Sequence, residues 1–225
     1  MANSEDAVSE PLLSQKLEAH ATWLRSLGVR GVRLDLSRCG IMFARLRGAD
    51  LVGACLQRAD LRQSDLSDVN FSGADLRGTD LRFAELARAD FSVAILKGAK
   101  FRGANLNGAN LRRAQLWQAD LQYASVRGVS LAGAELMGAQ LGGVDLTETK
   151  LCGADLGGAD LRKANLCGTD FRRANLRGAS LEGAIVDHDT NFAGTKADPT
   201  VFSGVDLDFL RAAYLPPCLR TTRAL

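Results

Sequence analysis

The apolar residues of this chain follow a five-residue period. From Leu36 to Val186 every fifth residue is apolar, and these 31 positions, called centres here, hold 24 leucines, four phenylalanines, Ile41, Val126 and Val186. An α-helix repeats its apolar face at about 3.6 residues and a β-strand at about 2, so neither element alone explains the spacing. We therefore expect the chain to coil around an apolar axis that every centre faces.

The other positions of each unit predict one turn per period. The residue two before the centre is Ala in 22 of the 31 units, and the residue between them is Asp or Asn in 17. Two residues after the centre, Gly occurs in 16 units and supplies the backbone freedom of a tight turn. Without that turn, successive centres would alternate between opposite faces of a strand. The pattern therefore predicts a solenoid with a thin core.

Units such as ADLRG (74–78), ANLNG (104–108) and ANLRG (174–178) resemble those of the pentapeptide-repeat family. The resemblance implies an all-β solenoid, a right-handed quadrilateral β-helix with four units in each coil. One inserted residue near Asp189 restores the repeat as TNFAG, a poor unit, TVFSG and VDLDF, which brings the total to 35 units and about nine coils. At the spacing of paired strands, the rod would be roughly 40 Å long.

Both ends of a solenoid expose core and unpaired strand edges, so both need covers. Residues 10–28 place Leu13, Leu17, His20, Ala21 and Leu24 near helical spacing, which predicts a short α-helical cap at the N-terminus. Residues 208–217 predict a short helical turn at the C-terminus. The predicted division is a tail and capping helix in 1–33, the solenoid in 34–209 with a register slip near 187–189, and a cap and tail in 210–225.

In gyrase-protecting members of the family, the corresponding C-terminal segment builds a dimer. The segment here is therefore expected to cap the rod, to form a homodimer, or both. The residues expected to make these contacts are Phe209, Leu210, Ala213 and Tyr214.

Charge and cysteine content narrow the setting of the protein. The 225 residues carry a net charge of +2, which gives no general attraction to nucleic acid or to an anionic membrane. The five cysteines are odd in number and lack C-x-x-C spacing, so neither a disulfide framework nor a zinc site is predicted. No run of 18 apolar residues or signal-peptide pattern occurs, and we expect a cytoplasmic protein without membrane contact.

Nothing in the sequence resembles a catalytic constellation, so we predict no enzyme activity, metal or cofactor. His20 is expected to pack on the first coil, and His188 to lie in a loop near the other end. The recurring Asp and Asn residues are expected to hydrogen-bond local backbone. Arg45, Lys100 and Lys150 take the same slot, which a metal array would not tolerate.

Two sets of outward residues are not required by the repeat. Phe43, Phe83 and Tyr123 are 40 residues apart and share one edge, with roughly 10 Å between neighbours. Met42 adjoins this edge, and Trp117 projects from the preceding side. Such a row marks a protein contact, a surface covered by the N-terminal segment, or ordinary isolated aromatics.

The second set is basic and would meet an acidic partner, or would simply keep a rod soluble. Its members lie in one coil, apart from a pair about three coils earlier that shares a face with two of them. They are Arg112, Arg113, Arg162, Lys163, Arg172, Arg173 and Arg177.

The favoured function is a non-enzymatic rigid scaffold that presents its faces to a protein partner. The alternative, implied by the resemblance, is a DNA-mimicking protein that binds DNA gyrase or topoisomerase and protects it against quinolone-type inhibitors. That role needs a strongly acidic surface, whereas the most negative of the four faces sums to only −2. Direct binding of nucleic acid is disfavoured by the near-neutral chain.

Overall fold

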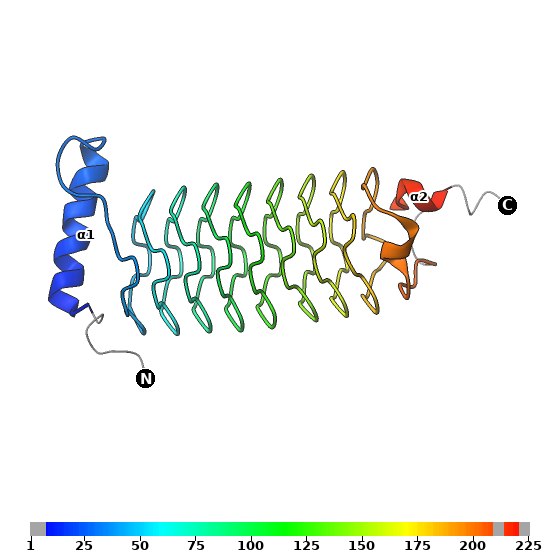
Figure 1. Cartoon of the computed structure of the whole chain (residues 1–225), viewed down its shortest axis with the longest axis horizontal. Coiled ribbons are helices and arrows are strands. Elements are labelled where there is room, and N and C mark those ends of the chain that lie inside the picture. The colour runs from blue at the N-terminus through cyan, green and yellow to red at the C-terminus, as the bar shows by residue number, and fades with distance from the viewer. Residues whose placement is uncertain (1–7, 209–213, 221–225) are drawn as a thin grey trace.

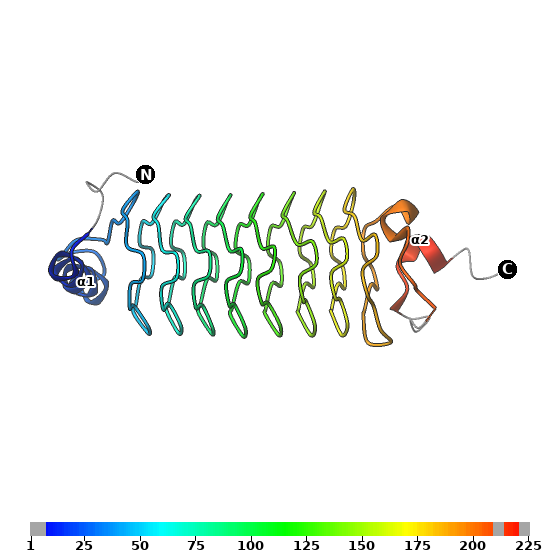
Figure 2. The ribbon, with the colours of Figure 1, turned by 90° about the horizontal axis from the view of Figure 1, so that it is seen from below.

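The chain winds into a long rod with a helix across one end and short helical segments at the other (Figures 1 and 2). This is seen in a computed structural model, which describes residues 8–208 and 214–220. The helices are α1 (Glu10–Arg25), the 3-10 helix η1 (Pro199–Phe202) and α2 (Pro217–Arg220). None of these helices is both long and apolar enough to cross a membrane.

Parallel β-bridges join each coil to the next at every fifth residue from Asp35 to Asn175. Bridge partners are 20 residues apart as far as Asn165, so four five-residue units make one four-sided coil. We number the sides by their first centres, which are Leu36, Ile41, Leu46 and Leu51. Each corner takes the number of the side that precedes it.

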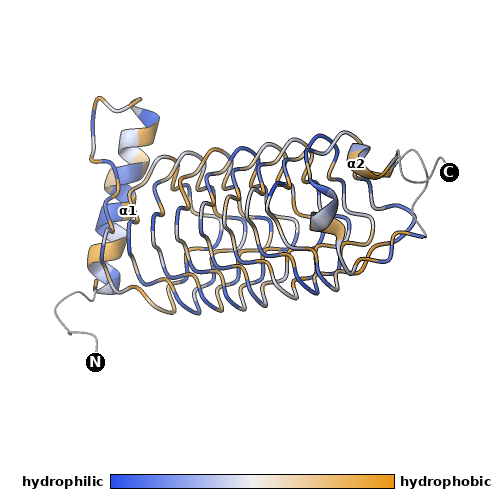
Figure 3. Cartoon of the chain, turned by 45° about the vertical axis from the view of Figure 1, so that its right-hand side comes forward, coloured by the Kyte–Doolittle hydropathy of each residue, from blue (hydrophilic) through white to orange (hydrophobic). Residues whose placement is uncertain are grey.

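The core is one continuous column inside the coils. All 31 centres are buried, and alanines line the wall beside them. Phenylalanine rings stack along the fourth side, where the centroids of Phe71 and Phe91 lie 5.0 Å apart. Polar wall residues are satisfied: the Thr79 hydroxyl, for example, donates to the Leu56 carbonyl at 2.7 Å. In Figure 3, polar and apolar residues accordingly alternate along every coil.

Each corner from Arg38 to Gly183 is a tight turn with a left-handed residue two positions after the centre. In one example, Ala54 N–H donates to the Leu51 carbonyl at 3.0 Å and Gly53 has φ +65°. Such a turn requires a positive φ at its third residue, and glycine adopts this without strain. In 14 of these corners the position holds another residue, and φ is still between 53° and 61°. The coil geometry therefore overrides the local preference of those side chains.

The N-terminal cap is fastened by a buried histidine and a glycine. His20 is fully buried, and its Nδ1 accepts the N–H of Leu34 at 3.1 Å. Gly31 has φ +79°, and a Cβ there would collide with the Ala19 carbonyl oxygen. The expected packing of His20 on the first coil is therefore found.

The C-terminal end departs from the regular repeat. After Asn165 the bridges join residues 21 apart, as between Asp170 and Asn191, which places one inserted residue in the last turn of the coil. The unit TVFSG keeps a buried Phe202 and a left-handed Gly204, but η1 replaces its bridge. The bridged ladder therefore ends at Lys196, because the proline at 199 begins a 3-10 helix instead of an extended segment.

Candidate functional site

Three large aromatic side chains project from the second corner. Phe43 is 62% exposed, Phe83 60% and Tyr123 69%, and all three have φ of 60°. Met42, in the preceding turn position of the first coil, is 37% exposed. Trp117 is 38% exposed but lies at the first corner, one corner before Tyr123 in the same coil. The structure thus aligns the three expected residues and sets Trp117 apart from them.

Phe83, Tyr123 and Trp117 each have a partner in a neighbouring coil. The Phe83 ring lies over Gly103, where a Cβ would come within 2.6 Å of it. The guanidinium of Arg102 lies 4.6 Å from the centre of the Tyr123 ring, and the Lys97 ammonium lies 5.6 Å from that of Trp117. These contacts orient the rings and leave their outer faces exposed.

A hollow opens beside Tyr123 because its ring does not cover the next glycine. Nothing lies within 4 Å of the Cβ position of Gly143, in contrast to Gly103. With Gly142, this leaves a floor without side chains in a hollow of about 590 Å³, which continues past Arg162 and Lys163 to Glu182 and Gly183. Gly142 is the feature of the sequence that indicates this hollow, because glycine is rare at the position directly after a centre.

The coil ladder is also loosened at this place. As a rule between bridged coils, the N–H of each centre donates to a bridge residue of the next coil, and the N–H of each bridge residue donates to a wall residue of the preceding coil. The N–H of each left-handed corner residue donates to a turn residue of the next coil, and all these bonds are about 2.6 to 3.4 Å long. Among the described residues, the N–H groups of Tyr123, Val126 and Asp145 lack the inter-coil carbonyl partners that their counterparts have. The bridge between Ser125 and Asp145 remains. In the regular part of the rod the loosening therefore lies at Tyr123 and on the side that follows it. Near the register slip, the N–H groups of Gly168 and Gly178 also lack inter-coil carbonyl partners.

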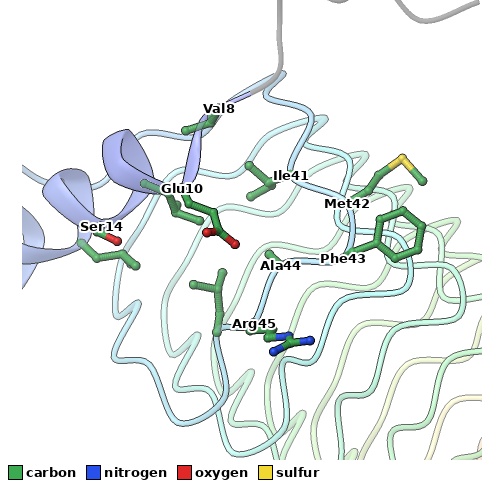
Figure 4. A pocket seen from close by; sticks show the side chains of 11 residues that line it. Val8, Glu10, Ser14, Ile41, Met42, Phe43, Ala44 and Arg45 are labelled. Carbon is green, nitrogen blue, oxygen red and sulfur yellow. The ribbon is translucent and has the colours of Figure 1, made fainter.

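The described part of the N-terminal segment, from Val8, reaches the first member of the aromatic row. Val8, Glu10 and Leu13 line a hollow of about 540 Å³ together with Met42 and Phe43. In Figure 4, the side chains of Met42 and Phe43 lie at its outer rim, and Glu10 extends into it from the helix. Phe83 and Tyr123 do not line this hollow, so residues 8–17 do not cover these two rings.

The basic residues do not form a single patch, because they occupy three corners. Arg162 and Lys163 lie at the second corner, beside the hollow at Tyr123. Arg177 lies at the first corner. The fourth corner, diagonally opposite the second, carries the remaining members, which are Arg112, Arg113, Arg172 and Arg173.

Some of these charges are neutralised within their own unit. Arg162 donates to both oxygens of Asp160, at 2.9 and 2.8 Å, and these hydrogen bonds hold the pKa of Asp160 below its ordinary value. Burial works to raise the pKa of Asp170, but the hydrogen bonds from Arg172 outweigh it and lower that pKa. The aspartates of the ladder therefore accept hydrogen bonds both from the turn backbone and from arginine side chains. The sequence predicted only the bonds to the backbone.

The histidines are far apart and have structural surroundings. Burial lowers the pKa of His20. The negative charge of Asp50 acts to raise this pKa, and the positive charge of Arg33 acts to lower it further. His188 Nε2 lies 3.2 Å from the carboxylate of Asp189 in the turn that holds the inserted residue.

Asp187, His188 and Asp189 bring three potential metal ligands within 4.8 Å of one another, a cluster that sequence reasoning missed. However, the Asp187 carboxylate already accepts the N–H groups of Gly168, Asp189 and Thr190. These bonds hold the one-residue insertion in place, which explains the cluster without an ion.

The C-terminal contact residues are only partly described. Phe209, Leu210 and Ala213 lie outside the described residues. The Tyr214 carbonyl accepts the N–H of Phe192 at 2.9 Å, and Leu215 is buried against the last coil. The segment around Tyr214 therefore covers the core.

Comparison with known proteins agrees with this architecture. A family model described as pentapeptide repeats matches residues 44–82, 75–113, 109–147 and 150–186. HetL, a pentapeptide repeat protein involved in heterocyst differentiation regulation from the cyanobacterium Nostoc sp. strain PCC 7120, is 31% identical over 85% of this chain and 93% of its own, with a TM-score of 0.46. No curated protein matches this chain.

Two further solved structures are similar to this chain. A pentapeptide repeat protein from the Arabidopsis thaliana thylakoid lumen is 38% identical over 44% of this chain and 66% of its own, with a TM-score of 0.35. QnrB1, a plasmid-mediated fluoroquinolone resistance protein, is 22% identical over 71% of this chain and 87% of its own, with a TM-score of 0.39. The expected right-handed quadrilateral β-helix is confirmed, and the chain belongs to the pentapeptide repeat family.

Proposed function

We propose that this protein is a non-enzymatic scaffold that binds a protein partner along its second corner, in the cytoplasm. The main support is the row of Phe43, Phe83 and Tyr123, which all have a left-handed backbone conformation. A non-glycine residue there costs stability, of the order of 1 kcal/mol, and these rings remain largely exposed. The fold therefore does not explain their presence, whereas aromatic side chains are common anchors in protein interfaces.

The hollow beside Tyr123 supports the same surface. It offers about 590 Å³ between an aromatic ring and Lys163, over a floor of Gly142 and Gly143. A partner side chain inserted there would contact backbone directly and stack on the ring. The loosened ladder behind it adds unpaired N–H groups at Tyr123 and Val126.

A gyrase-directed DNA mimic is the alternative, and the charge pattern weighs against it. Six arginines lie within 3 Å of an aspartate two residues earlier in the chain or one coil away, so the outward carboxylates do not form an open acidic face. A gyrase supercoiling assay with and without a fluoroquinolone separates the two functions. Protection at submicromolar protein would establish the mimic in place of the scaffold.

The scaffold is tested by recovering partners from lysate with wild type and with Phe83→Ser plus Tyr123→Ser. We expect the double variant to lose a protein that wild type retains. The control is Arg88→Ser plus Gln118→Ser, which changes the same turn position, also left-handed, at the third and first corners. Equal recovery by all three proteins would remove the second corner as a contact surface.

A further inference from the structure

The fourth side of the rod carries opposite charge at its two ends. Its first three units, from Ala49 to Val93, contain Asp50 and Asp90 and no basic residue. Its next four units contain one acid, Asp170, and five basic residues. The basic residues are Arg112, Arg113, Lys150, Arg172 and Arg173.

The arginines at this corner are mostly free to bind something else. Asp170 pairs with Arg172 at 2.8 Å. Within the described residues, no acidic group lies within ion-pair distance of Arg112, Arg113 or Arg173, and all three are exposed. The two arginine pairs are three coils apart, which is roughly 14 Å.

Small residues form the surface between the two pairs. Ala132, Gly133, Cys152 and Gly153 occupy the corner there, and nothing lies within 4 Å of the Cβ position of Gly153. A hollow of about 590 Å³ begins at Cys152 and Gly153, includes the second arginine pair and continues to Ala193 and Gly194 in the next coil. We call the corner from the first arginine pair to this hollow the trough: its surface between the pairs is made of small residues, and it is hollowed around the second pair.

We propose that this trough binds an extended acidic segment of a partner protein. An extended chain advances about 3.4 Å per residue, so two carboxylates about four residues apart would reach both arginine pairs. Arginine binds carboxylate through two parallel hydrogen bonds, and small side chains between the acids fit the trough. The inference rests on the proposed scaffold function but uses the opposite corner of the rod.

The neighbouring charges favour a single acidic strand over nucleic acid. Glu135 and Asp155 point outward on the first side, two residues beyond Gly133 and Gly153. A polyanion wider than one extended chain would meet these carboxylates along the trough. A narrow peptide with separated acids avoids them.

The test is fluorescence anisotropy of the full chain with a fluorescein-labelled nonapeptide of alanine and serine that carries two glutamates four positions apart, at low salt. We expect Arg113→Glu plus Arg173→Glu to weaken binding by at least about tenfold. The matched control is Arg58→Glu plus Lys163→Glu, because all four residues are left-handed and Glu148 shows that glutamate adopts this conformation. The control should stay within about twofold of wild type.

A second variant separates the trough from general charge attraction. Cys152→Phe keeps every charge and fills the hollow, at a turn position where Trp117 is accommodated elsewhere. Cys152→Phe should weaken binding of the nonapeptide by about tenfold. Placing the two glutamates of the peptide next to each other should weaken binding to wild type by a similar factor. Unchanged binding in either case, no binding by wild type, or tighter binding of a single-stranded oligothymidylate would overturn the proposal. Phe83→Ser plus Tyr123→Ser should bind the nonapeptide normally, so failure of the second corner leaves this result intact.

Discussion

Left-handed corner residues couple each coil to the next through their side chains. The Cγ of Arg113 lies 3.6 Å from the Cβ position of Gly133, and that of Lys163 lies 3.5 Å from that of Gly183. A long side chain in one coil thus lies over a glycine 20 residues later. The glycine serves both its own turn and the packing of the preceding coil.

The pair of Phe83 and Gly103 tests this second role. Gly103 and Gly48 have nearly the same φ, 71° and 70°. Replacing either by Ala should therefore lower the free energy of unfolding by a similar amount, about 1 kcal/mol, through backbone strain. Only at Gly103 would the new Cβ meet an aromatic ring, and we expect up to about 1 kcal/mol of additional destabilisation. Urea unfolding measures both changes. In a Phe83→Ala background the difference should vanish, and a difference that persists would contradict the contact.

An inward centre tolerates no charge. Leu106 is fully buried, and Leu106→Asp places a carboxylate on the core axis, which should cost more than about 3 kcal/mol and unfold the coil around it. Asn107→Asp, one residue further and outward, retains the oxygen that accepts the Ser125 hydroxyl and should melt close to wild type. Circular dichroism melts compare the two variants. Similar melting temperatures for them would show that the inward assignment is wrong.

At this scale the sequence predicts which side chains face inward but not how outward ones lean. Leu106 and Ala104 follow from the period alone. The ring of Phe83 covers its glycine and that of Tyr123 does not, although both residues occupy the same turn position. The Tyr123 ring instead lies against the guanidinium of Arg102, and such rotamer choices depend on the neighbouring coil.

Among the elements, α1 is joined to the first coil by a contact that requires a neutral imidazole. Nδ1 of His20 accepts the Leu34 N–H, and burial lowers the pKa of His20 below its ordinary value of 6.5. The unfolded chain therefore binds this proton more tightly than the folded chain. The stability that His20 contributes is present above pH 6.5 and is lost as the pH falls below that value.

This pH dependence is measurable in thermal unfolding. The melting temperature of wild type should fall between pH of about 7.5 and about 5.5, as His20 becomes protonated on unfolding. His20→Asn keeps an oxygen that can accept the Leu34 N–H and does not titrate, so its melting temperature should fall less. His188→Asn, at the exposed slip turn, should behave as wild type. Equal slopes for wild type and His20→Asn would exclude His20 as the titrating group.

The sequence predicts the N-terminal cap more accurately than the C-terminal one. The N-terminal helix was expected in residues 10–28 and spans Glu10–Arg25. At the other end, TVFSG was expected to continue the repeat, yet Pro199 begins η1 there. A single insertion breaks the pairing register, after which tertiary packing of Val201 and Phe202 over the core decides the local structure.

For the whole molecule, the loosened step between coils interrupts a ladder that is regular from the first coil to the region of the register slip. The Val126 N–H lacks the partner that equivalent centres such as Leu106 and Leu146 have. Hydrogen exchange at Val126 should therefore be faster than at those two centres, by about tenfold or more. Amide exchange followed by NMR measures the three sites in one experiment. Uniform protection along this column would show that the ladder is closed there.

The 20-residue register also makes the rod a ruler graduated in whole coils. Duplicating one full coil between Arg113 and Arg172 would add roughly 4.8 Å to their separation and leave both at the same corner. Duplicating a single five-residue unit would instead turn everything downstream by a quarter revolution and bring the second pair to the next corner. Recombination in steps of 20 could thus tune reach without disturbing the facing direction of any contact.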